Sequence, residues 1–215
     1  MSLTLYFHPL SSFCQKALVA LYENDTPFRP QIVDLGDEAS RAAFLKIWPI
    51  GKFPVLRDEA KNRIVPESSI IIEYLTQYYP GRTQLVPADP DLARQTRMRD
   101  RFFDLYVSEP MSRIVAERRR PAASKDPYGA EEARARLRTA LDMIEQDMAA
   151  KTWAMGEHFS MADCAAAPAL FYANLVMPFG AAHKNAAGYL ERLMQRPSFA
   201  RAVTEAKPYF HLFPQ

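Results

Sequence analysis

The sequence predicts an α/β unit followed by an all-helical domain, and three observations lead to this fold class. Within residues 1–80, short strand-like apolar runs alternate with segments whose apolar residues recur at helical spacing. Residues 80–91, PGRTQLVPADPD, break this periodicity with three prolines and one glycine, which is typical of a linker. Beyond them the apolar spacing is helical only. We therefore expect a first domain at residues 1–80, a linker at 81–91 and an all-helical domain at 92–215.

The first domain is expected to contain its elements in the order βαβαββα. Its predicted strands span residues 3–7, 27–35, 53–58 and 62–65, and its predicted helices span residues 12–23, 38–48 and 67–79. A βαβ unit places its two strands in parallel, whereas the short turn after residue 58 makes the last two strands antiparallel. The expected result is a small mixed sheet with helices on its faces.

The second domain is expected to consist of amphipathic helices around one apolar helix. Long helical patterns cover residues 92–120, 129–151 and 160–177, and shorter ones cover 186–195 and 198–206. Pro110 lies inside the first pattern, so we expect a kink or an interruption there. Ser160 and Asp163 have the spacing of a capping box, in which each side chain bonds the backbone N–H of the other residue. Cys164 is then a small core residue rather than a reactive thiol.

Charge and composition exclude several kinds of partner. The chain has 27 Lys and Arg against 25 Asp and Glu, and a net charge of +2 favours neither nucleic acid nor an anionic membrane. Residues 164–182 are uncharged, but Pro168, Asn174, Pro178 and Gly180 interrupt them, so we expect a buried helix rather than a membrane span. No secretory signal is visible and two cysteines make no disulfide framework, so we expect a cytoplasmic protein.

The turn between the first predicted strand and helix is a candidate catalytic site. Ser11, Ser12 and Cys14 lie in the sequence SSFC, where free backbone N–H groups and the helix dipole favour an anion. The same position lowers the pKa of a thiol, so SSFC has the form of a CxxC redox turn whose first cysteine is a serine. That serine can donate a hydrogen bond to the thiolate of another molecule. Alternatively, Ser11 or Ser12 only caps the helix and Cys14 is buried.

Two further stretches have the chemistry of a peptide-binding site. In GKFPVL, residues 51–56, Pro54 begins a predicted strand, and a cis Phe53–Pro54 bond leaves the N–H and C=O of Phe53 free for an extended peptide. In VPESS, residues 65–69, Glu67 and Ser68 begin a predicted helix. Ser68 and the N–H groups there can hold a carboxylate, and Glu67 can hold an ammonium group. Helix capping alone is the alternative for both.

The ordered set of SSFC, GKFPVL, the Glu67–Ser68 pair and FSMADC resembles the cytosolic glutathione transferases, and bacterial serine-type members in particular. The resemblance covers essentially the whole chain and implies a thioredoxin-like first domain. It also implies that Ser11 is the catalytic, thiol-activating hydroxyl, that Phe53 pairs with the cysteinyl backbone of glutathione, and that Lys52 meets its glycine carboxylate. The glutathione-binding residues that it implies are Ser11, Phe13, Lys52, Phe53, Pro54, Glu67 and Ser68.

The function implied by the resemblance is that of an enzyme that activates the glutathione thiol and adds it to small hydrophobic electrophiles, as in detoxification. Glutathione is then a co-substrate, no metal or other cofactor is expected, and the protein is expected to form a homodimer. The electrophile is expected between the two domains, near Tyr106 and Met111. The sequence ERRR at residues 117–120 is interpreted as a solvated helix end, where cations suit the dipole.

Several alternatives remain open at the level of sequence. Cys14 could form a mixed disulfide with glutathione, which would make the protein a thiol-exchange or peroxide-reducing enzyme. Tyr6 resembles the thiol-activating tyrosine of other classes in the superfamily, although we expect it to be a packed strand residue. His8 is expected to be structural. The chain could also keep the fold without turnover, as a binding or scaffold protein.

Overall fold

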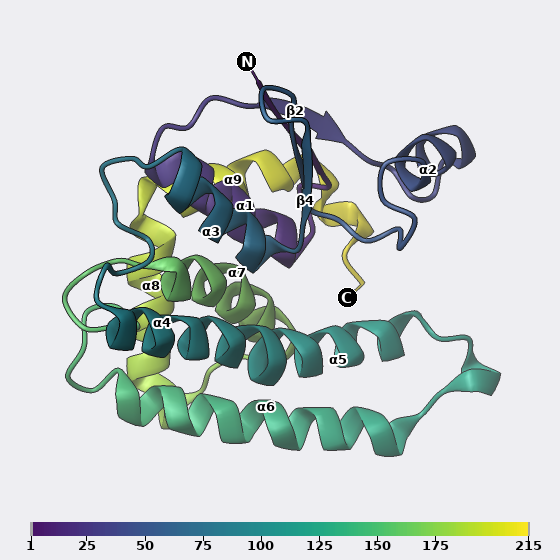
Figure 1. The fold of residues 1–215 in the computed structure, drawn as a ribbon. Helices are drawn as coiled ribbons and strands as arrows, with labels where there is room; N and C mark the ends of the chain where they lie inside the picture. The colour runs from purple at the N-terminus through teal and green to yellow at the C-terminus, as the bar shows by residue number, and fades with distance from the viewer. Residues whose placement is uncertain (1, 215) are drawn as a thin grey trace.

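The computed structural model describes residues 2–214, and its N-terminal part is a four-stranded mixed sheet with three helices (Figure 1). The elements occur in the order βαβαββα, so the predicted fold class of this unit is confirmed. They are β1 (Leu3–Phe7), α1 (Ser12–Glu23), β2 (Arg29–Ile32), α2 (Glu38–Leu45), β3 (Val55–Asp58), β4 (Arg63–Pro66) and α3 (Ser68–Tyr78).

The sheet has the strand order β2-β1-β3-β4, with β1 and β2 parallel and the other two pairs antiparallel. Leu5 lies opposite Pro30 on one side and Leu56 on the other. Because side chains alternate along a strand, Leu3 and Leu5 face the core shared with α1 and α3, whereas Tyr6 packs with Phe44 of α2 on the other face. The sheet is therefore covered on both faces.

The predicted second strand, residues 27–35, is reduced to β2, whose residues are all exposed. Pro30 has no backbone N–H to donate to a neighbouring strand, and proline within a sheet is therefore found on edge strands. The strand β2 is short and lies at the edge of the sheet. The predicted helix at 38–48 ends earlier, at Leu45. Both differences concern element ends rather than their order.

The second part of the chain is helical, as predicted. Its helices are α4 (Pro90–Phe102), α5 (Glu109–Arg119), α6 (Pro127–Asp147), α7 (Met161–Val176), α8 (Lys184–Gln195) and α9 (Pro197–Ala206). Short 3-10 segments span Ala122–Ser124, Ala181–His183 and Lys207–Leu212. The predicted interruption at Pro110 is a π-helical segment, Phe103–Ser108, that joins α4 to α5. Proline lacks the N–H for a regular helical bond, and the wider turn before it keeps the two helices continuous.

The apolar helix predicted at residues 160–177 is α7, which packs against α1, α4, α5 and α8. Its capping box is present: Asp163 accepts from the Ser160 N–H at 2.9 Å, and Ser160 Oγ caps the helix. Asp163 is fully buried and also accepts from Tyr189 Oη at 2.6 Å. Within residues 2–214, none of the helices combines the length and apolar character needed to cross a membrane.

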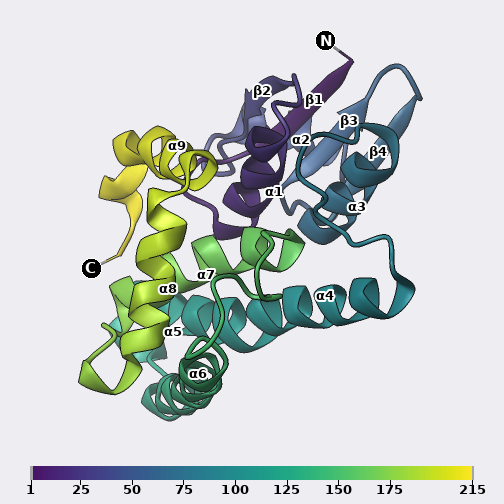
Figure 2. The same ribbon diagram turned by 90° about the vertical axis from the view of Figure 1, so that its left-hand side faces the viewer.

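Helix α1 lies between the sheet and the helical domain (Figure 2). Its last residue, Glu23, is buried and pairs with Arg196 through two contacts of 2.7 Å, and it also accepts from Ser198. Helix α1 packs along α7 and α9 as well. Helix α1 is therefore held where the two domains meet, and SSFC lies at its beginning, with Ser11 as the N-cap.

Candidate active site at the domain boundary

Ser11 is the N-cap of α1. Its Oγ accepts a hydrogen bond from the Cys14 N–H at 3.4 Å, and its own N–H donates to His8 O at 3.0 Å. This cap uses a lone pair of the Ser11 hydroxyl as acceptor. Since a hydroxyl is also a donor, its proton can be directed either to the Cys14 sulfur or to a ligand.

The turn that presents Ser11 is fixed from the helical domain. Tyr172 of α7 donates to Leu10 O at 2.8 Å, and Gln15 donates to Pro9 O at 2.9 Å and to Tyr172 Oη at 3.1 Å. Gln15 is fully buried. Packing between the domains thus sets the position of the turn.

The first turn of α1 leaves donors free beside Ser11. Within the described chain, the backbone N–H groups of Ser12 and Phe13 make no hydrogen bond, as expected for the first residues of a helix. These N–H groups and the positive end of the helix dipole favour a bound anion.

Cys14 does not share this environment. Its side chain is fully buried, and burial raises the pKa of the thiol to about 12, although a hydrogen bond with Ser11 partly opposes this shift. The thiol is therefore protonated at neutral pH and is covered by the core. Cys164 is likewise buried, and its pKa is raised well above its ordinary value.

A small pocket of about 170 Å³ lies on the sheet side of this turn. The Phe53–Pro54 peptide bond, at the start of β3, is cis as predicted. The lining contains six of the residues implied by the resemblance: Phe13, Lys52, Phe53, Pro54, Glu67 and Ser68.

Glu67, which precedes α3, has an unusual backbone conformation. Its φ is 71°, in a region that side chains other than glycine rarely adopt, and its carboxylate makes no capping hydrogen bond. Ser68 beside it is buried. Helix capping therefore does not explain the Glu67 carboxylate, which stays available at the pocket.

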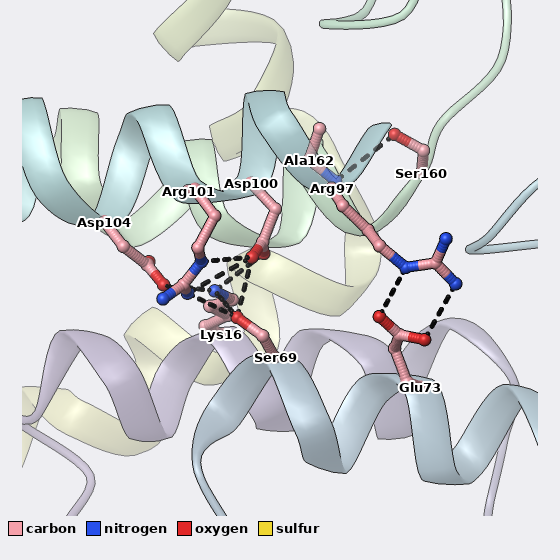
Figure 3. Close-up of polar contacts among 9 residues, drawn as sticks. All are labelled: Lys16, Ser69, Glu73, Arg97, Asp100, Arg101, Asp104, Ser160 and Ala162. Carbon is pink, nitrogen blue, oxygen red and sulfur yellow. Dashed lines mark hydrogen bonds and ion pairs between the residues drawn. The ribbon is translucent and has the colours of Figure 1, made fainter. Parts of the chain in front are cut away.

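Next to this pocket, four charged side chains form a closed group that joins α1 to α4 and to the π-helical segment after α4 (Figure 3). The four residues are Lys16, Asp100, Arg101 and Asp104, and Ser69 links them to α3. Lys16 is buried, and its Nζ lies 2.7 Å from both Asp100 Oδ1 and Asp104 Oδ2. It also donates to Ser69 Oγ at 2.8 Å, and Arg101 pairs with both carboxylates. Burial raises the pKa of Asp104, while Lys16 lowers it. Because Ser69 is the second residue of α3, this cluster fixes the beginning of that helix.

A larger cavity of about 380 Å³ lies on the other side of Phe13, toward the helical domain. Met111, predicted to contact the electrophile, is part of its lining. Tyr106 is not: its ring packs on Phe102 and is 57% exposed. The cavity is lined by Leu10, Ser11, Ser12, Phe13, Met111, Ser112, Val115, Ala116, Arg119, Tyr172, Leu212, Phe213 and Pro214.

Most of the cavity wall was not identified from the sequence. One stripe of α5 in this wall consists of residues four positions apart, Met111, Val115 and Arg119. Their helical spacing is a sequence signal that could have identified this part of the wall. Residues 212–214 start at the last residue of the 3-10 segment Lys207–Leu212 and have no motif that indicates where they lie.

The other candidate residues lie outside both cavities. Tyr6 packs with Phe44, with ring centroids 6.2 Å apart, on the α2 face of the sheet. His8 stacks on Phe53 and meets the Tyr209 ring edge-on, and burial lowers the pKa of its imidazole. Within residues 2–214, no group of three His, Cys, Asp or Glu side chains gathers as a metal site.

Relatives of this chain include a stringent starvation protein A homolog from Histophilus somni, which is 24% identical over 208 residues, 96% of this chain and 92% of the relative. The glutathione S-transferase-like protein LUC7 of Fusarium sp is 32% identical over 148 residues, 69% of this chain and 64% of that relative.

Among solved structures, a glutathione S-transferase from Methylobacillus flagellatus KT with GSH bound has a TM-score of 0.84 at 26% identity and covers 94% of this chain and 98% of its own. One from Methylobacterium radiotolerans JCM 2831, in complex with glutathione sulfonate, has a TM-score of 0.81 at 27% identity and covers 94% of each chain.

Two family models match the two parts of the chain in order. The glutathione S-transferase N-terminal domain matches residues 5–83, which contain the sheet unit, and the glutathione S-transferase C-terminal domain matches residues 127–192 in the helical part. Together they span more than half of the chain. The chain therefore belongs to the cytosolic glutathione transferase superfamily.

Proposed function

We propose that this protein is a glutathione transferase, in which the Ser11 hydroxyl stabilises the thiolate of bound glutathione and a small hydrophobic electrophile reacts with it. The observation that supports this most is that the two cavities share Phe13. One side offers groups for a γ-glutamyl peptide, and the other offers Ser11 beside apolar side chains. The relative from Methylobacillus flagellatus KT with GSH bound supports glutathione as the ligand.

In this proposal glutathione lies in the smaller pocket. The free carboxylate of Glu67 pairs with the ligand ammonium, and Ser68 with the first N–H groups of α3 holds the γ-glutamyl carboxylate. The backbone of Phe53, which makes no hydrogen bond with the described residues, pairs with the cysteinyl unit. Lys52 is exposed and meets the glycine carboxylate.

The thiol of the ligand then lies at the beginning of α1. Ser11 donates its hydroxyl proton to the sulfur, and the free N–H groups of Ser12 and Phe13 add to the positive potential there. Each stabilises the thiolate more than the thiol, so the thiol pKa falls and its proton goes to solvent. The thiolate sulfur then bonds to the electrophilic carbon held in the larger cavity, the bond from that carbon to its leaving group breaks, and the leaving group departs with the electron pair. Binding energy and positioning supply the remainder of the catalysis.

Steady-state kinetics with glutathione and 1-chloro-2,4-dinitrobenzene test this role. Ser11→Ala is expected to lower kcat by roughly 10- to 100-fold, the size of one lost stabilising donor. Ser12→Ala is the matched control, because Ser12 lines the same cavity but does not cap the helix, and its kcat should stay within about threefold of wild type. Equal loss in both variants would contradict the assignment to Ser11.

The kinetics also separate the alternative functions. Glutathione binding by the wild-type protein without any turnover would support a non-catalytic role. Thiol exchange through Cys14 is not proposed, because the buried, protonated thiol offers neither access nor a thiolate.

We also propose that the protein forms a homodimer through α3 and α4. Ile70 of α3 and Met98 of α4 are 53% and 51% exposed. Ile70 lines one surface hollow together with Glu73 and Arg97, whose bidentate ion pair Figure 3 shows. Exposed apolar residues around a fixed ion pair are typical of a protein interface. Light scattering should give twice the 24.5 kDa chain mass, and a monomer mass would contradict the proposal.

A further inference from the structure

The larger cavity combines apolar walls with one charged side chain. Phe13, Met111, Val115 and Phe213 supply apolar surface. Among the lining residues that the structure describes, Arg119 is the one with a charge. Met111 and Arg119 share a stripe of α5 and lie about 12 Å apart along the helix axis, since each residue rises 1.5 Å. The cavity thus has room for a small aromatic group with a polar substituent at its far end.

Arg119 has no acidic partner in the described chain. Its guanidinium donates to one carbonyl, Leu212 O at 3.0 Å, and no carboxylate of residues 2–214 forms an ion pair with it. The bond to Leu212 turns the guanidinium toward the chain end that closes the cavity. Four of the five N–H donors of an arginine therefore remain without a protein acceptor among the described residues.

The neighbouring charged residues are engaged elsewhere. Arg118 donates to Pro214 O and Val176 O, and Arg113 pairs with Glu109 on the solvent face of α5. Glu117 pairs with Arg120 and accepts from the Asp126 N–H. The cavity therefore faces a net positive charge that the nearby carboxylate does not neutralise.

We propose that the electrophile used by this protein contains a carboxylate, and that Arg119 recognises it within the larger cavity. This inference rests on the proposed transferase function and adds a substrate class to it. A guanidinium binds a carboxylate through two parallel, charge-assisted hydrogen bonds, while the apolar walls hold the body of the molecule. This proposal adds a role to the interpretation of residues 117–120 as a solvated helix end, because Arg119, the exposed last residue of α5, also lines the cavity.

The probes are 4-chloro-3-nitrobenzoate and its methyl ester, which differ in charge but little in shape. In both, the glutathione sulfur bonds to the ring carbon that bears chlorine, the carbon–chlorine bond breaks, and chloride leaves with the electron pair. The thiol proton goes to solvent, and no oxidant or reductant is needed. Each kcat/KM is divided by the rate constant of the uncatalysed reaction with glutathione, which removes the difference in intrinsic reactivity.

For the wild-type protein, the normalised kcat/KM is expected to be about 5- to 10-fold higher for the acid than for the ester, the scale of one partly exposed charge-assisted pair. Arg119→Gln should bring this ratio to about 1, mainly by raising KM for the acid. Arg119→Lys should keep part of the preference, and added salt should reduce it. Arg113→Gln, on the same helix but outside the cavity, should leave the ratio unchanged.

An unchanged ratio in Arg119→Gln would overturn the inference. An equal loss for acid and ester would overturn it as well, because it would show that Arg119 only holds the chain end through Leu212. Calorimetry with the two glutathione conjugates of these probes provides a second readout. If the wild type turns over neither these probes nor 1-chloro-2,4-dinitrobenzene, the proposed function fails, and the ratio of dissociation constants for acid and ester conjugates still decides the role of Arg119.

Discussion

The smaller pocket and the larger cavity meet at Phe13, and they are built in different ways. The smaller pocket takes its walls from three short stretches of the sheet unit, at residues 13, 52–54 and 67–68. The larger cavity takes its walls from residues 10–13, 111–119, 172 and 212–214, so it forms only when the helical domain packs on α1. Local turns thus define one site, and domain packing defines the other.

The two sites also differ in how their charges are arranged. Next to the smaller pocket, Lys16, Arg101, Asp100 and Asp104 form a closed group in which every charge has a partner. In the larger cavity, Arg119 has no acidic partner among the described residues. Changes in the closed group should therefore affect stability, whereas changes in the cavity should affect substrate choice.

The largest expected effect is in the closed group. Lys16→Met removes the buried cation and leaves two buried carboxylates with Arg101 alone, so the free energy of unfolding should fall by about 3–5 kcal/mol. Urea denaturation measures this loss. The control is Arg134→Gln, which breaks an exposed ion pair with Glu131 on α6 and should cost about 1 kcal/mol or less. Equal losses in the two variants would remove the distinction between the buried cluster and the surface pairs.

A smaller effect is expected at the pocket itself. The double variant Glu67→Ala, Ser68→Ala leaves the ligand ammonium and carboxylate without partners, so glutathione affinity should fall by about 2–3 kcal/mol, roughly 30- to 150-fold. Isothermal calorimetry measures it, with Glu59→Ala as a control because that carboxylate pairs with Arg57 away from the pocket. Unchanged glutathione affinity in the double variant would show that the ligand lies elsewhere.

The difference between the two sites also explains why the smaller pocket could be predicted from the sequence and most of the larger cavity could not. SSFC, GKFPVL and the Glu67–Ser68 pair indicate their roles through local backbone chemistry: a cap, a strand that begins with proline, and a helix start. Phe13 of SSFC lies together with Lys52, Phe53, Pro54, Glu67 and Ser68 in the smaller pocket, whereas Ser11 and Ser12 line the larger cavity. The larger cavity depends on which face of α5 meets α1 and on where the chain ends, and neither follows from local pattern. Tyr106, predicted with Met111 to contact the electrophile, lies on the exposed side of the π-helical segment between α4 and α5.

The smallest expected effect concerns Cys14. Because burial raises the pKa of its thiol to about 12, Cys14→Ala should keep kcat within about twofold, and iodoacetamide should label the native protein at pH 7.5 far more slowly than the unfolded protein. Mass spectrometry follows the labelling. A glutathione adduct on Cys14 that forms and reverses during turnover would contradict this account and would support thiol exchange.

The most direct test of the central claim is the ionisation of bound glutathione. Ultraviolet difference spectra of the protein–glutathione complex, recorded as a function of pH, report the thiolate. The account predicts that the wild-type complex shows thiolate at neutral pH, well below the usual thiol pKa of about 8.5. Ser11→Ala should bind glutathione within a few-fold of wild type, yet require a pH higher by about 1–2 units to show the same absorbance, which corresponds to about 1.4–2.7 kcal/mol. Tyr6→Phe should titrate like the wild type. Loss of the thiolate signal in Tyr6→Phe, with Ser11→Ala unchanged, would contradict the account.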